Sequence, residues 1–126
     1  MSPTVDDEAV LARLRELIEA WPETFEKLSH GSPTWWGGKK TFAMFHNGSY
    51  DDGAPSVWFL APEGAQEALI ASNSDLFYRP KYLGPRGWVG MRLRADTDWN
   101  EVRGHLLRGY RMVAPKRALA ALDGAS

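Results

Sequence analysis

The sequence contains no cysteine, and it has neither a long apolar run nor a strong net charge. Without cysteine there is no disulfide, no thiol nucleophile and no cysteine-ligated metal centre. No window approaches the roughly 18 consecutive apolar residues of a membrane-spanning helix, and the first residues are acidic where a secretory signal would be basic. We therefore expect a soluble, cytoplasmic protein that makes no membrane contact.

The chain does contain enough apolar and aromatic material for one hydrophobic core. It has 126 residues, 44% of them hydrophobic, with six tryptophans, five phenylalanines and four tyrosines. This length is common for a single domain, and the composition is that of a globular protein. We expect one domain over residues 1–126.

Three longer segments have the periodicity or the boundary residues of helices. Apolar residues recur at three- and four-residue spacing over 10–21, and Pro22 ends the pattern. A second helix is expected behind Pro62, a residue suited to the first helical position. A third begins at Asp98, which has an acidic residue three positions later as in a capping box, and Pro115 ends it and starts a short C-terminal helix.

Five shorter segments have the composition of strands. The second of them is apolar on both faces, with Phe42 and Met44 on one side, which is typical of a central strand. The order of elements is helix, three strands, helix, two strands, helix and a helical tail. This order predicts an α+β fold: a two-layer sandwich in which helices cover one face of a mostly antiparallel sheet of about five strands. The expected strands are 24–30, 40–46, 56–61, one near 77 and one near 90.

Positive charge is concentrated in the last third of the chain. Residues 79–117 hold ten basic and three acidic residues, a net charge of +7, whereas residues 1–26 have a net charge of −5. The densest part is RPKYLGPRGWVGMRLR, Arg79 to Arg94, which predicts a basic turn followed by a strand with one basic face. A phosphate-binding loop is disfavoured here, because the glycine spacing matches neither of the common phosphate-binding motifs.

Several short motifs together resemble one known family. SHGSP, KTFAMF, YLGPRGWV and YRMVAPKR, which begin at residues 29, 40, 82 and 110, occur in the order and at the spacing of the MmcQ/YjbR-like proteins. The resemblance covers most of the chain, from Val10 to Leu119. It implies a two-layer α+β fold related to the frataxin-like and secretion-chaperone-like architectures. Proteins of this family are often labelled DNA-binding, because two hairpins were proposed to act as a double wing.

We therefore predict a non-enzymatic protein that binds nucleic acid, with DNA as the partner that the resemblance implies. The first of the two wings, His46 to Pro55, departs from this idea, because it holds Asp51 and Asp52 and no lysine or arginine. The alternative is that the charges of the second hairpin only keep an exposed turn soluble. The expected interface consists of phosphate-binding cations and two stacking aromatics: Lys81, Arg86, Arg92, Arg94, Lys116 and Arg117, with Tyr82 and Trp88.

A second possible function is that of a binding module for another protein, a second copy of the chain or a small ligand. It would use the exposed sheet face and the segment PTWWGGKK, with His30, Trp35, Trp36 and Lys39 as the contact residues. Tryptophans that flank glycine-rich turns are expected to be partly exposed, and those on apolar faces to be buried. The first group is Trp35, Trp36 and Trp88, and the second is Trp21, Trp58 and Trp99.

Catalytic and metal sites are not indicated. Ser29 and His30 are adjacent, and adjacent residues of a strand point to opposite faces, so they would not form a nucleophile–base pair. A turn at this position is the simpler interpretation. The other histidines, His46 and His105, are far apart in the sequence and match no metal-binding spacing. We expect no catalytic residue, no metal and no cofactor.

Overall fold

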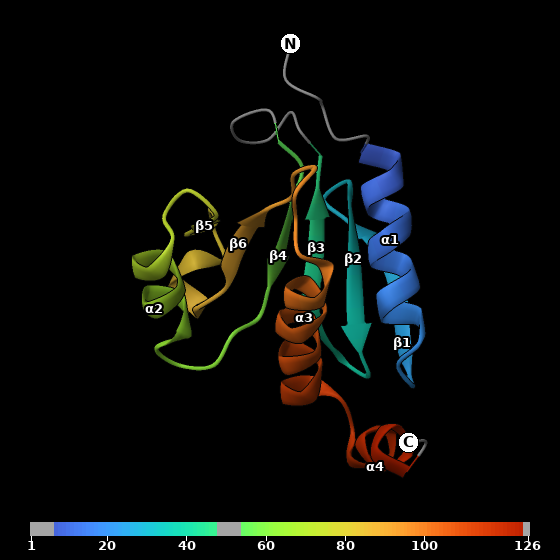
Figure 1. The fold of residues 1–126 in the computed structure, drawn as a ribbon. Coiled ribbons are helices and arrows are strands. Elements are labelled where there is room, and N and C mark those ends of the chain that lie inside the picture. The colour runs from blue at the N-terminus through green and yellow to red at the C-terminus, as the bar shows by residue number, and fades with distance from the viewer. Residues whose placement is uncertain (1–6, 48–53, 125–126) are drawn as a thin grey trace.

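The computed structural model shows an α+β fold built on a six-stranded antiparallel sheet (Figure 1). It describes residues 7–47 and 54–124. The helices are α1 (Asp7–Glu19), α2 (Ala65–Ser72), α3 (Trp99–Val113) and α4 (Lys116–Gly124). The strands are β1 (Thr24–Ser29), β2 (Ser32–Gly37), β3 (Lys40–His46), β4 (Ser56–Phe59), β5 (Phe77–Tyr78) and β6 (Val89–Arg92). The expected sandwich of helices and antiparallel sheet is confirmed.

The strands lie in the order β1-β2-β3-β4-β6-β5, and every neighbouring pair is antiparallel. Helices α1 and α3 pack on the same face of the sheet, α2 lies beside β5 and β6, and α4 lies beyond the C-terminal end of α3 (Figure 1). The final strand pair places the segment between β5 and β6, which is the basic stretch of the sequence, at one end of the sheet next to α2.

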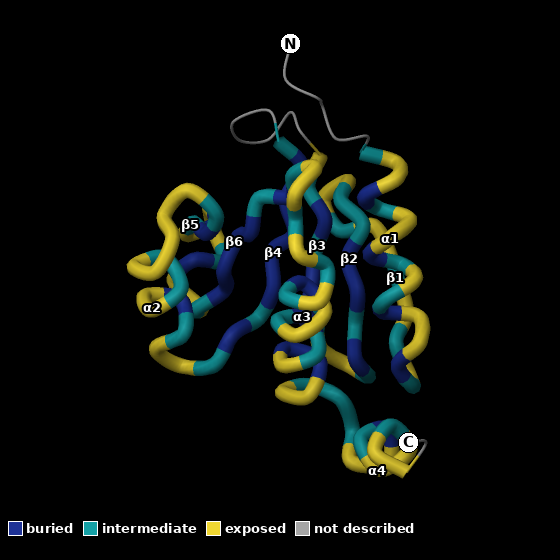
Figure 2. The backbone as a smooth tube through the Cα atoms, in the orientation of Figure 1, coloured by how far each residue is buried: buried dark blue, intermediate teal, exposed yellow. Residues whose placement is uncertain are grey.

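The core fills the layer between the sheet and the helices α1 and α3, as the buried segments in Figure 2 show. Each helix contributes a stripe of three fully or almost fully buried residues at helical spacing, as predicted for 10–21. Tyr110 of α3 packs against Trp21 and Phe42 with ring centroids 5.4 and 5.6 Å apart. The helix stripes are Val10, Leu14 and Ile18 in α1, and Val102, Leu106 and Tyr110 in α3.

Strand β2 was not predicted, so the expected count of about five strands was one too low. The segment that looked like a glycine-rich loop pairs with β1 through a two-residue turn at His30 and Gly31, whose φ angles are 52° and 83°. Two consecutive residues with positive φ are the signature of a tight hairpin turn, in which glycine is favoured at the second position. The interpretation of SHGSP as a turn is confirmed.

A β-bulge in β3 changes the expected orientation of Phe42. The register shifts between Trp35 and Trp36, which pair with Ala43 and Thr41, so Phe42 is the extra residue. The prediction that Phe42 shares a face with Met44 was wrong, because the bulge turns its ring toward Trp21 and α3. The central position of β3 in the sheet is confirmed.

Helix boundaries follow the local capping chemistry. The Asp98 carboxylate accepts hydrogen bonds from the backbone N–H groups of Asn100 and Glu101, which confirms the predicted start of α3. Helix α2 begins three residues later than predicted, at Ala65, because Gly64 has a φ of 86° and interrupts the helical backbone after Pro62.

The sheet face opposite α1 and α3 carries a hydrogen-bonded aromatic cluster. The Tyr78 hydroxyl accepts a hydrogen bond from Trp58 Nε1 at 2.7 Å and shares another with Ser56 Oγ at 2.7 Å. The ring of His46 lies against Trp58, with centroids 3.8 Å apart, and its Nδ1 is 3.4 Å from Ser32 Oγ. Most of the first proposed wing, residues 48–53, lies outside the described residues.

The burial of His46 makes the folded state less stable in acid. Burial lowers the pKa of His46 from 6.5 to about 4, because the charged imidazolium is poorly solvated on the sheet face. Between pH 6.5 and pH 4 the unfolded chain binds the proton more readily than the folded chain, so the stability of the fold decreases as the pH drops. Because the ring keeps some contact with solvent, we expect a loss of about 1 kcal/mol from pH 7 to pH 5. His46→Gln should remove this loss, as measured by urea unfolding at both pH values; an unchanged pH dependence would contradict it.

Candidate nucleic-acid interface

The segment 79–87, here called the basic loop, connects β5 to β6 and contains the 3₁₀ turn η1 (Gly84–Arg86). Hydrogen bonds between its own backbone groups stabilise its conformation. Gly84 N–H donates to Pro80 O at 2.8 Å, and Arg86 N–H donates to Leu83 O at 3.0 Å. Gly87 closes the turn with a φ of 85°, and its N–H donates to Gly84 O at 3.0 Å. The loop is therefore an ordered turn with a fixed set of outward side chains.

One buried side chain of α2 fixes the basic loop to the rest of the domain. Gln66 Nε2 donates hydrogen bonds to the carbonyl oxygens of Gly84 at 2.9 Å and Trp88 at 2.6 Å. Only 7% of Gln66 is exposed, so these bonds form away from solvent and hold both ends of the turn. An ordered loop loses little conformational entropy when it binds a ligand.

The two aromatic residues proposed for stacking have opposite environments. Trp88 is only 4% exposed, so its expected exposure was wrong and its ring is not available to stack on a base. Tyr82 is 87% exposed, the highest fraction of any large apolar or aromatic residue that the structure describes. Its φ of 66° is unfavourable for a residue with a side chain. The loop therefore presents one aromatic ring to solvent from a strained backbone position.

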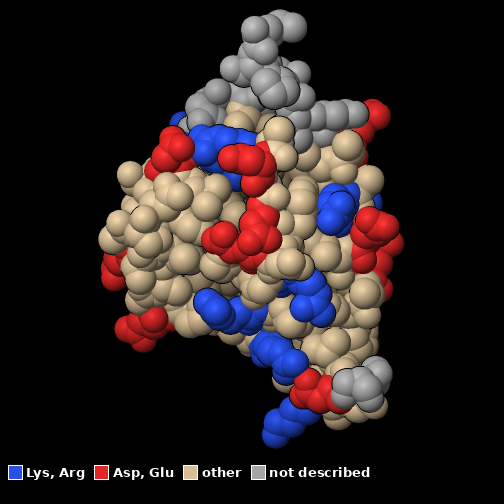
Figure 3. Space-filling view, in the orientation of Figure 1, with Lys and Arg blue, Asp and Glu red and all other residues tan. Residues whose placement is uncertain are grey.

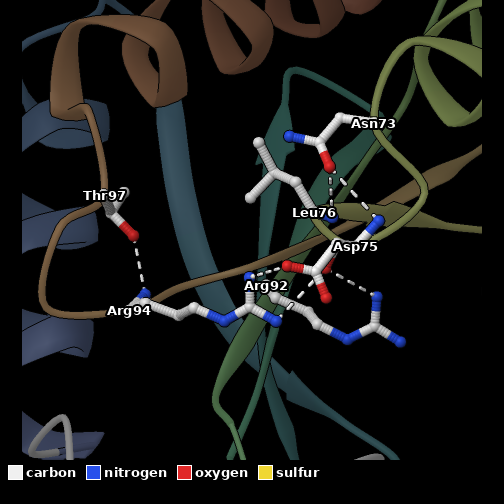
Figure 4. A network of polar contacts seen from close by, with 6 residues as sticks. All are labelled: Asn73, Asp75, Leu76, Arg92, Arg94 and Thr97. Atoms are coloured by element: carbon white, nitrogen blue, oxygen red, sulfur yellow. Dashed lines mark hydrogen bonds and ion pairs between the residues drawn. The ribbon is translucent and has the colours of Figure 1, made fainter. Parts of the chain in front are cut away.

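Arg92 and Arg94 are held by the segment between α2 and β5 (Figure 4). Arg94 pairs with the Asp75 carboxylate at 3.2 Å, and both arginines donate to Asp75 O at 3.2 Å. Asn73 Oδ1 accepts from the backbone N–H of Asp75 and thereby fixes this carboxylate. The Arg92 guanidinium also lies 4.6 Å from the ring centroid of Tyr78. These two cations stabilise the local fold, and phosphate would compete with partners already in place.

The basic residues of α3 and α4 form a second area of positive charge. Figure 3 shows basic side chains over the C-terminal part of α3 and over α4, and side chains of both signs over the other parts of this face. Arg117 makes a two-pronged ion pair with Glu23 at 2.6 and 2.7 Å. Arg111 pairs with Asp123 at 2.7 Å. Lys116 is exposed and forms no ion pair with any residue of the described chain. Of the cations predicted in this area, it is therefore the one that is available to bind a phosphate.

Within the described residues, the basic loop holds three exposed cations without an ion pair: Arg79, Lys81 and Arg86. Arg79 was not among the predicted contact residues, although its place in the same basic stretch of sequence pointed to it. Its side chain crosses Gly84 so closely that an added Cβ there would lie 2.6 Å from Arg79 Cγ. Of the predicted cations, Lys81 and Arg86 belong to the same loop as Tyr82, whereas Lys116 is the first residue of α4.

The alternative ligand surface is not assembled as predicted. Trp35 is 1% exposed and belongs to the core, so its expected exposure was wrong. Trp36 is partly exposed and stacks on Phe25, with centroids 5.4 Å apart and planes at 6°. His30 and Lys39 are exposed, but they lie at opposite ends of β2, in the turns before and after it. These four residues therefore do not form one surface.

Comparison with known proteins identifies no relative, since no family model, no curated protein and no solved structure matches this chain. The resemblance to the MmcQ/YjbR-like proteins stays a prediction. In residues 7–47 and 54–124, no group of three or more histidine or acidic side chains is placed to hold a metal ion. None of the described helices is long and apolar enough to cross a membrane.

Proposed function

We propose that this protein binds single-stranded nucleic acid through the basic loop. Lys81, Arg86 and Arg79 attract the phosphates, and the ring of Tyr82 stacks on an unpaired base. The observation that carries the proposal is the exposure of Tyr82 from a positive-φ position, with three cations of the same loop free of carboxylate partners in the described chain. Strained backbone positions are concentrated at functional sites.

The arrangement favours single strands over duplexes. A stacking ring needs the face of an unpaired base, which a duplex does not present. The loop is short and is followed by a buried strand, so it offers neither a helix nor a ribbon long enough to enter the major groove. We therefore expect most of the affinity to come from phosphate attraction and stacking.

Replacing the exposed ring tests the stacking contribution. We expect Tyr82→Ala to weaken binding of a short single-stranded DNA by about tenfold, since stacking on one base contributes roughly 1–3 kcal/mol. Tyr82→Phe keeps the ring and should bind like the wild type. Both affinities are measured by fluorescence anisotropy. The slope of log affinity against log salt should not change in either variant, because no charge is removed.

The outcome that contradicts the stacking role is equal affinity of Tyr82→Ala and Tyr82→Phe for the oligonucleotide. A salt slope that falls in Tyr82→Ala would also contradict it, since the loop would then have lost phosphate contacts. Circular dichroism of both variants checks the fold.

Recruitment of a protein partner at β1 is the second candidate. Among the described strands, β1 is an edge strand that pairs only with β2. It carries two of the exposed large apolar residues, Phe25 at 41% and Leu28 at 72% exposure. An exposed edge with apolar side chains can pair with a strand of another chain. If that chain is a second copy, light scattering should show self-association of the wild type, and Leu28→Lys should abolish it. A wild type that stays monomeric at all concentrations would exclude a second copy as the partner at this edge.

A further inference from the structure

A groove of about 480 Å³ lies between the basic loop, the start of α2 and the C-terminal part of α3. Its volume is within the range of about 300–1,000 Å³ that is usual for small-ligand sites. Arg79 and Arg86 line it on the side of the basic loop, and Glu63 and Glu67 line it on the side of α2. Leu60 and Met112, which is 47% exposed, add apolar surface.

The two arginines and the two glutamates line the same groove but form no ion pair with each other. In the described chain, neither carboxylate forms an ion pair with Arg79 or Arg86. The groove is therefore lined by two cationic side chains, two anionic side chains and apolar surface. A ligand that pairs with all of these side chains would carry an anion, a flat apolar face and N–H donors.

A nucleotide has these three parts. Its phosphate suits the arginines, its base face suits Leu60 and Met112, and the edge of its base can donate to a carboxylate. Carboxylates only accept hydrogen bonds, so Glu63 and Glu67 would repel a phosphate and favour a base edge with adjacent N–H groups. Guanine offers two such groups side by side, whereas thymine has one N–H between two carbonyl oxygens.

We propose that this groove holds one unpaired guanine of the bound single strand, with its phosphate at Arg79 and Arg86 and its N–H edge at Glu63 and Glu67. This inference rests on the proposed function and adds a base preference to it. Contact with a base edge would also give a role to two exposed glutamates beside the basic loop, where they would otherwise only weaken phosphate binding.

The test compares two labelled oligonucleotides by fluorescence anisotropy: a short oligothymidylate and the same strand with one central guanine. The wild type should bind the guanine-containing strand about fivefold to tenfold more tightly, the lower part of the range for a good bidentate contact. Glu63→Gln combined with Glu67→Gln should reduce this ratio to below about twofold. Binding of the oligothymidylate should stay the same or tighten slightly, because negative charge has been removed.

The matched control is Glu16→Gln with Glu19→Gln, which makes the same charge change on the exposed side of α1 and should keep the guanine preference. Equal wild-type affinity for both strands would overturn the guanine site while leaving the proposed function in place. A preference that persists in the Glu63 and Glu67 variant would also overturn it. If neither strand binds at about 50 mM salt, the proposed function and this inference both fail.

Discussion

Gly109→Ala is expected to destabilise the fold by about 2–3 kcal/mol and to lower the melting temperature by roughly 10 °C. Gly109 lies in the C-terminal third of α3, where the helix passes close to the sheet. A Cβ at this position would lie 2.7 Å from Leu60 O and 3.5 Å from Phe42 O. Both atoms belong to the backbone, of β3 and of the residue that follows β4, so the helix must move away from the sheet. That movement would also loosen the packing of Tyr110 between Trp21 and Phe42.

Gly104→Ala is the matched control, because it makes the same substitution five residues earlier in the same helix. No atom lies within 4 Å of a Cβ added at Gly104. Alanine has the higher helix propensity, so this variant should gain about 0.5–1 kcal/mol. Thermal unfolding of both variants, followed by circular dichroism, gives the comparison. Equal stability of Gly109→Ala and Gly104→Ala would contradict the close contact between α3 and the sheet.

Reversing two charges of the basic loop should have the largest effect on binding. We expect Lys81→Glu with Arg86→Glu to weaken binding of single-stranded DNA by about 50-fold at low salt, since two phosphate contacts are lost. The slope of log affinity against log salt should fall by about 1.4, because each contact with a single strand contributes roughly 0.7. Both side chains are exposed and have no ion pair in the described chain, so the fold should be unaffected.

The control for this variant is Lys39→Glu with Lys40→Glu. It changes the net charge by the same amount in the turn before β3 and at the first residue of β3, and both lysines are exposed. Its binding should fall only slightly, through the change in overall charge. Equal losses of affinity in the two variants would mean that the attraction comes from the net charge of the whole molecule. The assignment of the binding site to the basic loop would then be wrong.

The fold was predictable to a large extent, because its helices and most of its strands follow simple patterns. The stripe over 10–21 and the cap at Asp98 gave two helices with their correct faces. Strand β2 was missed because its hairpin turn uses His30 and Gly31, and because Pro33 and the glycines after Trp36 resemble a loop. The orientation of Phe42 was missed because a bulge is a property of the pairing of two strands.

The candidate site was predictable only in part. Net charge by segment pointed to the basic loop, but it could not separate free cations from paired ones. The partners of Arg94 and Arg117 are 19 and 94 residues away in the sequence, so their ion pairs appear only in the folded chain. Tyr82 and Trp88 have the same local setting of glycine, proline and basic residues. Only the tertiary packing decides that the tyrosine is exposed and the tryptophan buried.

The salt dependence of wild-type binding tests the central claim most directly. A labelled single-stranded oligonucleotide is titrated at about 50 and 200 mM salt, the range in which phosphate contacts are most visible. Three contacts from the basic loop predict binding at the lower concentration that weakens by about 20-fold at the higher one. A matching duplex should bind more weakly, because it offers no open base to Tyr82. No binding at the lower salt concentration, or affinity that does not change with salt, would contradict a nucleic-acid interface at the basic loop.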